Sequence, residues 1–457
     1  MARLFGTDGV RGVAITELTV ELAMNLGKAL ASYLISVQEI PEGAAAKTPY
    51  IIVGKDPRIS SDIIEAALVA GMTAAGANAQ LVGIVPTPAV AYFTTKYEAD
   101  AGVMITASHN TAEFNGIKLF NCEGFKFPDE VEDYLEKLVA SPESIPLKSG
   151  KEVGRVFEKS TAISDYCFGI TQLADNRTFE GMNIIVDCAN GCASLAAGQI
   201  LSVLGADCLL INNSPNGMNI NDKCGSTYME DFAKQVVEGK FDLGIAFDGD
   251  ADRMLAVDER GNIIDGDKII ALIAAFMRQK GKLLSDTVVV TVMSNMGFHQ
   301  YMKNNGLKVA VVPVGDRFVV EKMFEDGCSI GGEQSGHIIF KELSTTGDGL
   351  LTAVKLLVML KDRAVPMSAL VSQIPTFPQV LKNVPLSADK RGLWEQNAAI
   401  TGTIEQIKAQ AGANARILVR ESGTEPLLRV MVEGKELAQV NAWADQICAV
   451  VQQQLGA

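Results

Sequence analysis

Short apolar runs that end in a polar or glycine turn and lead into a helical stretch recur along the chain. One copy covers residues 50–76, a second 183–205 and a third 287–306. Each run is apolar at consecutive positions, which is typical of a strand with both faces covered by helices. The pattern predicts an α/β fold with three similar mixed-sheet domains in series.

The pattern changes near residue 372. A helical stretch at 389–412 precedes two short strands, 416–422 and 427–434, and the segment 435–455 is an amphipathic helix. Strands with helices on one side are typical of a smaller α+β domain. Because 457 residues exceed one compact core, we expect four domains. Their predicted ranges are 1–155, 156–256, 257–371 and 372–457.

Composition narrows the class of protein. The net charge of −14 argues against a nucleic-acid partner, because binding a phosphate backbone takes an excess of Lys and Arg. A few local cations can still hold a small anionic substrate. The longest apolar runs, such as 269–277, are about half of the ~20 residues that a membrane span needs. The N-terminal stretch also lacks the apolar centre of a signal peptide. With eight scattered cysteines and no C-x-x-C motif, we expect a cytoplasmic protein with reduced thiols and no membrane partner.

The strongest chemical signal is an acidic loop in which Asp248, Asp250 and Asp252 alternate. On an extended loop, alternate side chains project the same way, so three carboxylates would converge. Such like charges repel unless a hard cation lies among them, and oxygen ligands suit Mg²⁺. An EF-hand loop matches at Glu259 but fails at Arg253, where glycine is required, and its flanks read as strands. A solvated acidic turn is the simpler alternative.

Ser108 follows a buried strand at 103–105. A structural loop serine is the common case, and the G-x-S-x-G pattern of a hydrolase is absent. On extended backbone the adjacent His109 would point elsewhere, so acyl transfer lacks its base. Phosphoryl transfer needs a metal, cations and a proton shuttle, which the aspartates, Arg253 and Lys118 would supply if the fold brings them together.

A polar loop near the C-terminus is a candidate phosphate cradle. Ser422, Gly423 and Thr424 offer hydroxyl and backbone N–H groups, and Arg420 and Arg429 flank them. The alternative is a polar hairpin turn.

Two further segments carry weaker signals. Glu333, Ser335 and His337 lie between glycines and suit sugar hydroxyls, although a tight turn with a satisfied histidine fits equally. Arg11 lies in the glycine-rich stretch "FGTDGVRG", where an exposed arginine in a turn is the simpler interpretation.

These five segments, in this order, resemble the α-D-phosphohexomutase superfamily. "TASHN" is similar to its phosphoserine loop, "DGDADR" to its metal loop, "GGEQSGH" to its sugar-binding loop and "RESGTEP" to its phosphate-binding loop. The resemblance runs from residue 5 to about 434. It implies four domains around a central cleft.

The resemblance also implies roles. Ser108 would be a phosphoserine that gives its phosphoryl group to a hexose monophosphate and recovers the other phosphate from a 1,6-bisphosphate. One Mg²⁺ per subunit would be held by the three aspartates and a phosphoserine oxygen. Lys118, with Arg11, would serve proton transfer and charge stabilisation, for which the lysine pKa would have to be depressed by nearby Arg and Mg²⁺ charge. His109 would be a loop or phosphate contact.

Three details resemble the branch of the superfamily that converts glucosamine 6-phosphate to glucosamine 1-phosphate for amino-sugar and peptidoglycan precursors. They are the N-terminal "FGTDGVRG", Gln334 in the sugar loop, and the pair Asp316 and Arg317. The substrate would be a hexosamine phosphate, with glucosamine 1,6-bisphosphate as activator and intermediate. Thr111, where many relatives have proline, and the spacer "AEFNGIK" depart from the pattern. A phosphomannomutase or phosphoglucomutase and a Mg²⁺-dependent sugar phosphatase are the alternatives, and the sequence leaves a homodimer open.

Overall fold

The computed structural model describes residues 3–6, 8–38, 47–387, 390, 392–412, 415–421 and 427–456. The chain divides into two compact units. The first comprises residues 1–292 and 307–371, and the second comprises 293–306 and 372–457. Each unit is described by itself.

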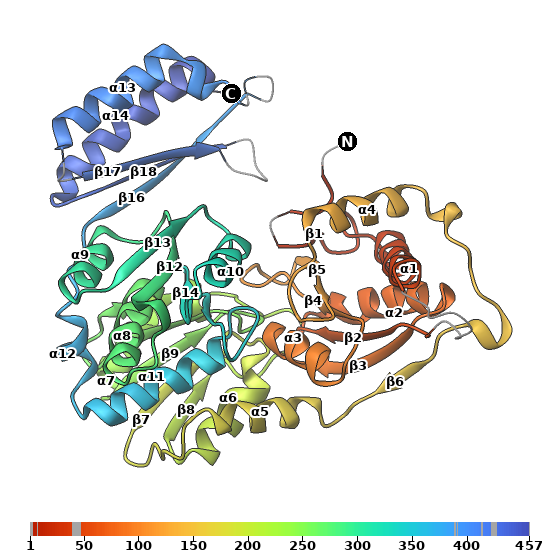
Figure 1. The fold of residues 1–457 in the computed structure, drawn as a ribbon. Coiled ribbons are helices and arrows are strands. Elements are labelled where there is room, and N and C mark those ends of the chain that lie inside the picture. Colours follow the sequence, from red (N-terminus) through yellow and green to blue (C-terminus); the bar gives the residue numbers. More distant parts are fainter. Residues whose placement is uncertain are drawn as a thin grey trace. The chain divides into compact units, whose positions relative to one another are not determined.

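The first unit begins with a six-stranded sheet in the order β1-β5-β4-β2-β3-β6, in which only β5 runs antiparallel to its neighbours (Figure 1). Ile51, Val53 and Val103 pack on one face against α1 and α2. On the other face α3 approaches closely, because a Cβ at Gly54 would lie 2.6 Å from a Val90 methyl carbon. The elements are β1 (Val10–Val13), α1 (Val20–Ser36), β2 (Tyr50–Lys55), α2 (Ile59–Ala74), β3 (Asn78–Ile84), α3 (Thr87–Lys96), β4 (Ala101–Ile105), β5 (Phe114–Asn121), α4 (Asp129–Ala140) and β6 (Val156–Glu158).

The second sheet of this unit has the order β11-β10-β9-β7-β8, with β7, β8 and β9 parallel and β10 antiparallel to β9. The strand Leu243–Phe247 in the middle of this sheet is buried at all five positions. The elements are α5 (Ala162–Gln172), β7 (Asn183–Asp187), α6 (Ala193–Val203), β8 (Asp207–Ile211), α7 (Met229–Glu238), β9 (Leu243–Phe247), β10 (Met254–Asp258) and β11 (Ile263–Ile264).

The third sheet has the order β13-β12-β14-β15 and is also mixed. Its elements are α8 (Gly266–Gln279), β12 (Thr287–Thr291), β13 (Lys308–Val312), α10 (Asp316–Glu325), β14 (Ile330–Gly332), β15 (Ile338–Phe340), α11 (Gly349–Arg363) and α12 (Met367–Val371). The prediction of three mixed-sheet α/β domains is confirmed, and each predicted strand-to-helix unit is present.

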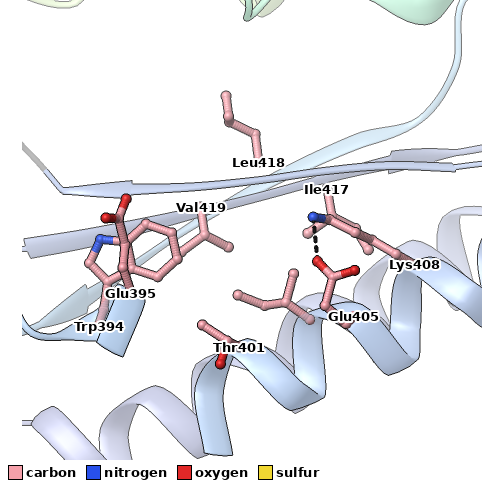
Figure 2. A pocket seen from close by; sticks show the side chains of 9 residues that line it. Trp394, Glu395, Thr401, Glu405, Lys408, Ile417, Leu418 and Val419 are labelled. Carbon is pink, nitrogen blue, oxygen red and sulfur yellow. Dashed lines mark hydrogen bonds and ion pairs between the residues drawn. The ribbon is translucent and has the colours of Figure 1, made fainter. Parts of the chain in front are cut away.

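The second unit is an antiparallel sheet, β16-β18-β17, with helices packed on it. This confirms the predicted smaller α+β domain. Its elements are α9 (Met296–Asn304), β16 (Gln379–Pro385), α13 (Ala398–Ala411), β17 (Ala415–Glu421), β18 (Leu427–Gly434) and α14 (Leu437–Leu455). A hollow of about 310 Å³ lies between α13 and β17, with Trp394, Ile417 and Val419 around it (Figure 2).

Three details differ from the sequence-based expectations or extend them. The helix expected over 389–412 begins at Ala398, because the Asn397 side chain accepts the first free N–H groups as an N-cap. The strand β16 had not been predicted. The helix of the third strand-to-helix unit, α9, belongs to the second compact unit: the carboxylate of Glu433 in β18 accepts the Met296 N–H at 2.7 Å. The boundaries at 155, 256 and 371 stay a prediction.

None of the helices in the described ranges is long and apolar enough to cross a membrane.

The backbones of helices α1 and α2 lie in direct contact at two glycines. A Cβ added at Gly27 would lie 2.2 Å from the Leu68 carbonyl oxygen, and one at Gly71 would lie 2.0 Å from that of Met24. Real Cβ atoms do not approach backbone so closely. Glycine at these two positions therefore sets the distance between the helices that cover the first sheet.

We expect Gly71→Ala to destabilise the first unit by about 1–3 kcal/mol, because the added methyl group forces α1 and α2 apart. The matched control is Gly402→Ala in α13, where nothing lies within 4 Å. That substitution should stabilise its helix by up to about 1 kcal/mol. Thermal unfolding of the two variants measures both effects. Equal behaviour of the two would contradict the proposed helix contact.

Candidate active site

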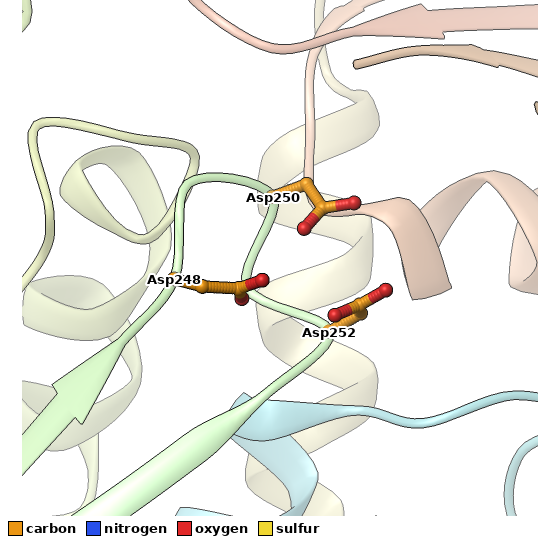
Figure 3. A group of neighbouring side chains, drawn as sticks. All are labelled: Asp248, Asp250 and Asp252. Atoms are coloured by element: carbon orange, nitrogen blue, oxygen red, sulfur yellow. The ribbon is translucent and has the colours of Figure 1, made fainter. Parts of the chain in front are cut away.

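The loop between β9 and β10 brings three carboxylates together. The side chains of Asp248, Asp250 and Asp252 project from this one loop into the same space (Figure 3), and a ligand oxygen of each lies within 4.8 Å of the others. All three residues are buried. The expected convergence is present, but its cause differs: the loop turns, with Ala251 at φ 55°, and is not extended. The flanking elements are strands, which excludes the EF-hand.

Gly249 lets other segments close on this loop. A Cβ at that position would lie 2.6 Å from the Ser108 carbonyl oxygen and 2.6 Å from Asn221 Nδ2. The Cys192 N–H, just before α6, donates to the Gly249 carbonyl at 2.8 Å. The acidic loop is thus contacted at its backbone from two sides, by Ser108 and Asn221 on one side and by Cys192 on the other.

The Ser108 hydroxyl reaches the acidic loop. It donates to Asp248 Oδ2 at 2.8 Å. Ser108 has φ 50°, so the chain turns here, and His109 Nδ1 lies 3.4 Å from Ser108 Oγ. The expectation that His109 points elsewhere is therefore wrong, because it assumed extended backbone. Burial, and then the guanidinium groups of Arg253 and Arg11, lowers the pKa of His109 to about 4, so its imidazole is neutral at pH 7.

Lys118, in β5, is buried with its ammonium among carboxylates. Its Nζ lies 2.9 Å from Asp250 Oδ2, 3.1 Å from Asp252 Oδ2 and 3.2 Å from Asp8 Oδ2. Burial by itself would lower the pKa of Lys118, but these three carboxylates outweigh it and raise the pKa well above its usual range. The expectation of a depressed lysine pKa is wrong for this set of protein groups. Lys118 is an ammonium ion here.

One ammonium does not balance the acidic loop. Burial, and then the charges of Asp252 and Asp250, raises the pKa of Asp248 well above its usual range. The buried Oδ1 of Asp250 accepts no hydrogen bond from the described residues. Asp252 Oδ1 likewise accepts none, and three carboxylates with two such oxygens are a set that fits a divalent cation such as Mg²⁺.

A second lysine, which is half-buried, pairs with carboxylates beside this site. Lys126 Nζ lies 2.6 Å from Asp8 Oδ1 and 2.6 Å from Asp316 Oδ2. Asp8 also pairs with Arg11, which places that predicted residue beside the site. The sequence analysis had assigned no role to Asp8 or Lys126, although Asp8 lies within the quoted N-terminal motif.

His337, from the sugar-loop motif, lies between two of these carboxylates. Its Nδ1 is 3.6 Å from Asp252 Oδ1, and its Nε2 is 3.6 Å from Asp316 Oδ2. The Gly347 N–H donates to Nε2 at 3.0 Å, so Nε2 carries the lone pair and the ring proton faces Asp252. The histidine is therefore not only a satisfied core residue, because it links the acidic loop to the third sheet.

Other predicted residues lie around this centre. The Arg253 N–H donates to Asp248 Oδ1 at 3.2 Å, and its Nε is 3.7 Å from Asp252 Oδ1. Glu333 accepts from the Gly315 N–H at 3.3 Å and from the Ser335 hydroxyl at 3.4 Å.

The candidate phosphate cradle belongs to the second unit. Arg420 in β17 and Arg429 in β18 are directly opposite each other in the sheet. Ser422, Gly423 and Thr424 lie outside the described residues. Two arginines in register at this end of the β17–β18 pair supply local positive charge.

The first unit thus brings together a serine hydroxyl, three buried carboxylates and several fixed cations. Thr87 adds a contact that had not been predicted: its hydroxyl donates to Asp250 Oδ2 at 2.6 Å. Groups of this kind serve phosphoryl transfer, in which positioning and charge stabilisation supply most of the catalysis.

Comparison with known proteins defines the class. Models of the phosphoglucomutase/phosphomannomutase family match α/β/α domain I at residues 2–145, domain II at 164–261, domain III at 265–377 and the C-terminal domain at 381–450. The chain belongs to this family, and the predicted phosphohexomutase fold and isomerase class are confirmed.

Curated relatives of the chain carry a more specific name than the family as a whole. Phosphoglucosamine mutase of Clostridium acetobutylicum is 46% identical over 453 residues, which cover 99% of both chains. The phosphoglucosamine mutases of Caldicellulosiruptor bescii and Caldanaerobacter subterraneus are 44% and 46% identical, each over 100% of both chains.

Solved structures share the fold at low identity. A phosphoglucomutase/phosphomannomutase family protein of Burkholderia thailandensis has a TM-score of 0.78 at 22% identity, covering 99% of this chain and 98% of its own. Aspergillus fumigatus N-acetylphosphoglucosamine mutase, solved in complex with GlcNAc-6P and magnesium, has a TM-score of 0.70 at 18% identity, covering 99% and 96%.

We expect Lys126→Met to destabilise the protein by about 1–3 kcal/mol, because Asp316 loses this ion pair while Asp8 keeps Arg11 and Lys118. The matched control is Lys322→Met in α10, whose partner Glu325 is 71% exposed. That pair should be worth less than about 1 kcal/mol. Denaturant unfolding of both variants tests the difference, and equal losses of stability would contradict the importance of Lys126.

Proposed function

We propose that this protein is a phosphoglucosamine mutase, which interconverts glucosamine 6-phosphate and glucosamine 1-phosphate through a phosphoserine at Ser108. The observation that carries the proposal is the 2.8 Å hydrogen bond from Ser108 Oγ to Asp248 in the acidic loop. This contact joins a serine hydroxyl to the cluster of three buried carboxylates, an arrangement that supports phosphoryl transfer beside a bound cation. The full-length relatives named phosphoglucosamine mutase support the substrate.

In the forward half-reaction, the bond from Ser108 Oγ to phosphorus breaks and a bond from phosphorus to a sugar hydroxyl oxygen forms. The hydroxyl proton passes to a group of the site, and the product is glucosamine 1,6-bisphosphate. In the second half-reaction the other phosphoryl group returns to Ser108. The same bisphosphate would act as activator by charging any serine that has lost its phosphate.

Asp248, Asp250 and Asp252 would hold one Mg²⁺ together with a phosphoserine oxygen. The ion would supply positive charge against the phosphoryl oxygens. The fit rests on the three buried carboxylates and on the Asp250 oxygen that accepts no hydrogen bond from the described residues.

The surrounding cations have complementary roles in the proposal. Lys118, as an ammonium ion, offsets the acidic loop and stabilises charge that develops on the transferring group. Its role as proton carrier stays a prediction. Arg11 and Arg253 would attract the substrate phosphate, and neutral His109 would contact the phosphoryl group beside Ser108.

Two further groups of residues would bind the substrate. Glu333, Ser335 and His337 would bind sugar hydroxyl or amino groups. The phosphate that is not transferred would be held by the C-terminal set, Arg420, Ser422, Gly423, Thr424 and Arg429. A solved fold relative of N-acetylphosphoglucosamine mutase type that contains GlcNAc-6P is consistent with a hexosamine phosphate as ligand.

We expect the purified protein, given Mg²⁺ and a trace of hexose 1,6-bisphosphate, to isomerise glucosamine 6-phosphate faster than the glucose and mannose 6-phosphates. The inactive control is Ser108→Ala, and exposed Ser202→Ala in α6 should be fully active. A preference for a neutral hexose phosphate would indicate a phosphoglucomutase or phosphomannomutase. Continuous release of inorganic phosphate would indicate a phosphatase.

We expect Asp250→Asn to weaken Mg²⁺ binding by about tenfold or more, because one charged ligand is lost from the acidic loop. The measurement is the rise in thermal midpoint on titration with Mg²⁺, which reports binding without turnover. Asp231→Asn, at a side chain that is 75% exposed, is the control and should respond like the parent protein. An undiminished response in Asp250→Asn would contradict the metal assignment.

A further inference from the structure

The backbone of the Ser108 loop is held by two side chains to which the sequence analysis had assigned no role. Ser108 itself is in the left-handed region, at φ 50°, which a residue other than glycine adopts at a cost of order 1–3 kcal/mol. Such a conformation persists only where its surroundings determine it. The contacts that do so come from Arg58 and Asn221.

Arg58, the residue before α2, is fully buried under the loop and uses all five of its N–H donors. Its Nε donates to Asp56 Oδ2 at 2.8 Å. The other four N–H groups donate to carbonyl oxygens of the loop, and the acceptors are Ser108 (3.1 Å), Asn110 (2.8 Å), Thr111 and Phe114 (3.1 Å). A planar fork with fixed donor directions fits this set, and a lysine could not replace it.

Asn221 reaches the same loop from the second sheet's side. Its Nδ2 donates to the Ser108 carbonyl at 2.8 Å and to the Asn110 carbonyl at 2.9 Å. The residue is 5% exposed and has φ 57°, which Asn tolerates well. The same nitrogen also lies against Gly249 in the acidic loop. Asn221 thus lies between the serine loop and the acidic loop and contacts both.

The loop is fixed from the N-terminal side as well. The Ser108 N–H donates to Thr106 Oγ1 at 2.9 Å, and that hydroxyl donates to Asp56 Oδ2 at 2.7 Å. Asp56 is in turn the partner of Arg58. One network therefore holds both the N–H and the C=O of Ser108, while its hydroxyl donates to Asp248.

We propose that Arg58 and Asn221 form a carbonyl clamp that positions Ser108 for phosphoryl transfer. The proposal rests on the proposed function and adds two positioning residues to it. Neither side chain touches the hydroxyl. By holding the carbonyls of residues 108 and 110 between them, they keep the backbone turned so that Oγ faces Asp248.

The clamp also explains how the serine stays aligned with the acidic loop, although the two belong to different sheets. Arg58 fixes the serine loop to α2 of the first sheet, and Asn221 fixes it to a loop of the second. A misplacement of about 1 Å can reduce a rate about 100-fold, so alignment at this level is a catalytic requirement.

The sharpest test is Asn221→Asp. Aspartate has the same shape and tolerates the same φ, but its carboxylate cannot donate to the two carbonyls. Asn221→Ala removes the side chain altogether. The matched control is Asn219→Ala in the same loop, because Asn219 Nδ2 donates to Ser214 within that loop at 3.1 Å.

Two readouts are measured on the full-length protein. Hydrogen–deuterium exchange of residues 106–114 reports loop order directly. Steady-state kinetics with glucosamine 6-phosphate report positioning. We expect about 10-fold or faster exchange in both Asn221 variants, a kcat lowered about 10- to 100-fold and a KM within about twofold of the parent value. Asn219→Ala should change neither.

Unchanged exchange in Asn221→Asp would overturn the clamp. Faster exchange with unchanged kcat would overturn its role in positioning Ser108. If the parent protein has neither turnover nor an about 80 Da heavier phosphorylated form, the proposed function fails, and the exchange data still decide whether the clamp exists. Arg58→Lys, which keeps the charge but loses the fork, should show faster exchange than Asn221→Ala, and slower exchange would contradict the assignment of Arg58.

Discussion

Three carboxylates are buried in one short loop, and their mutual repulsion has to be compensated by other groups of the first unit. Asp248, Asp250 and Asp252 lie within 4.8 Å of one another, where their mutual repulsion is strong. The protein offsets it with a buried ammonium from the first sheet, Lys118, and the third sheet turns the Nδ1–H of His337 toward Asp252 at 3.6 Å. The cost of leaving these charges uncompensated is what makes the contacts between the three sheets specific, since each sheet contributes a partner that the others lack.

The acidic loop also needs close backbone approach, and glycine provides it. Gly249 has the Ser108 carbonyl and Asn221 against its Cα, so a side chain there would push the serine loop away. The charges and the packing therefore act together. The ion pairs hold the loops near one another, and the glycine and the carbonyl clamp set the distance at which the Ser108 hydroxyl meets Asp248. A flexible loop would satisfy the charges equally well but would not fix that distance.

Local patterns were enough to predict the α/β architecture and the convergence of the three carboxylates, because strand periodicity and short motifs are visible within a few residues. The roles of Ser108 and Lys118 came from the family resemblance, and the structure brings both residues to the acidic loop. Which charges and side chains surround each of these residues could not be predicted from local patterns. The pKa of Lys118 follows from carboxylates more than 100 positions away along the chain, and the position of His109 follows from a left-handed turn at Ser108. Asp8 lies in the N-terminal motif, but neither it nor Lys126, Arg58 or Asn221 had been given a role, since each acts through partners from distant segments.

The carbonyl clamp explains why threonine is tolerated at position 111, where many members of the family have proline. The Thr111 side chain is exposed, and the part that the loop uses is its carbonyl, which accepts from Arg58 and from the Phe114 N–H. Proline offers the same carbonyl and differs by restricting the residue before it. Here that residue, Asn110, is already restrained through its own carbonyl by both Arg58 and Asn221. The rigidity that a proline would add to the loop is thus supplied by side-chain donors, so the sequence can vary at 111 while the serine keeps its alignment.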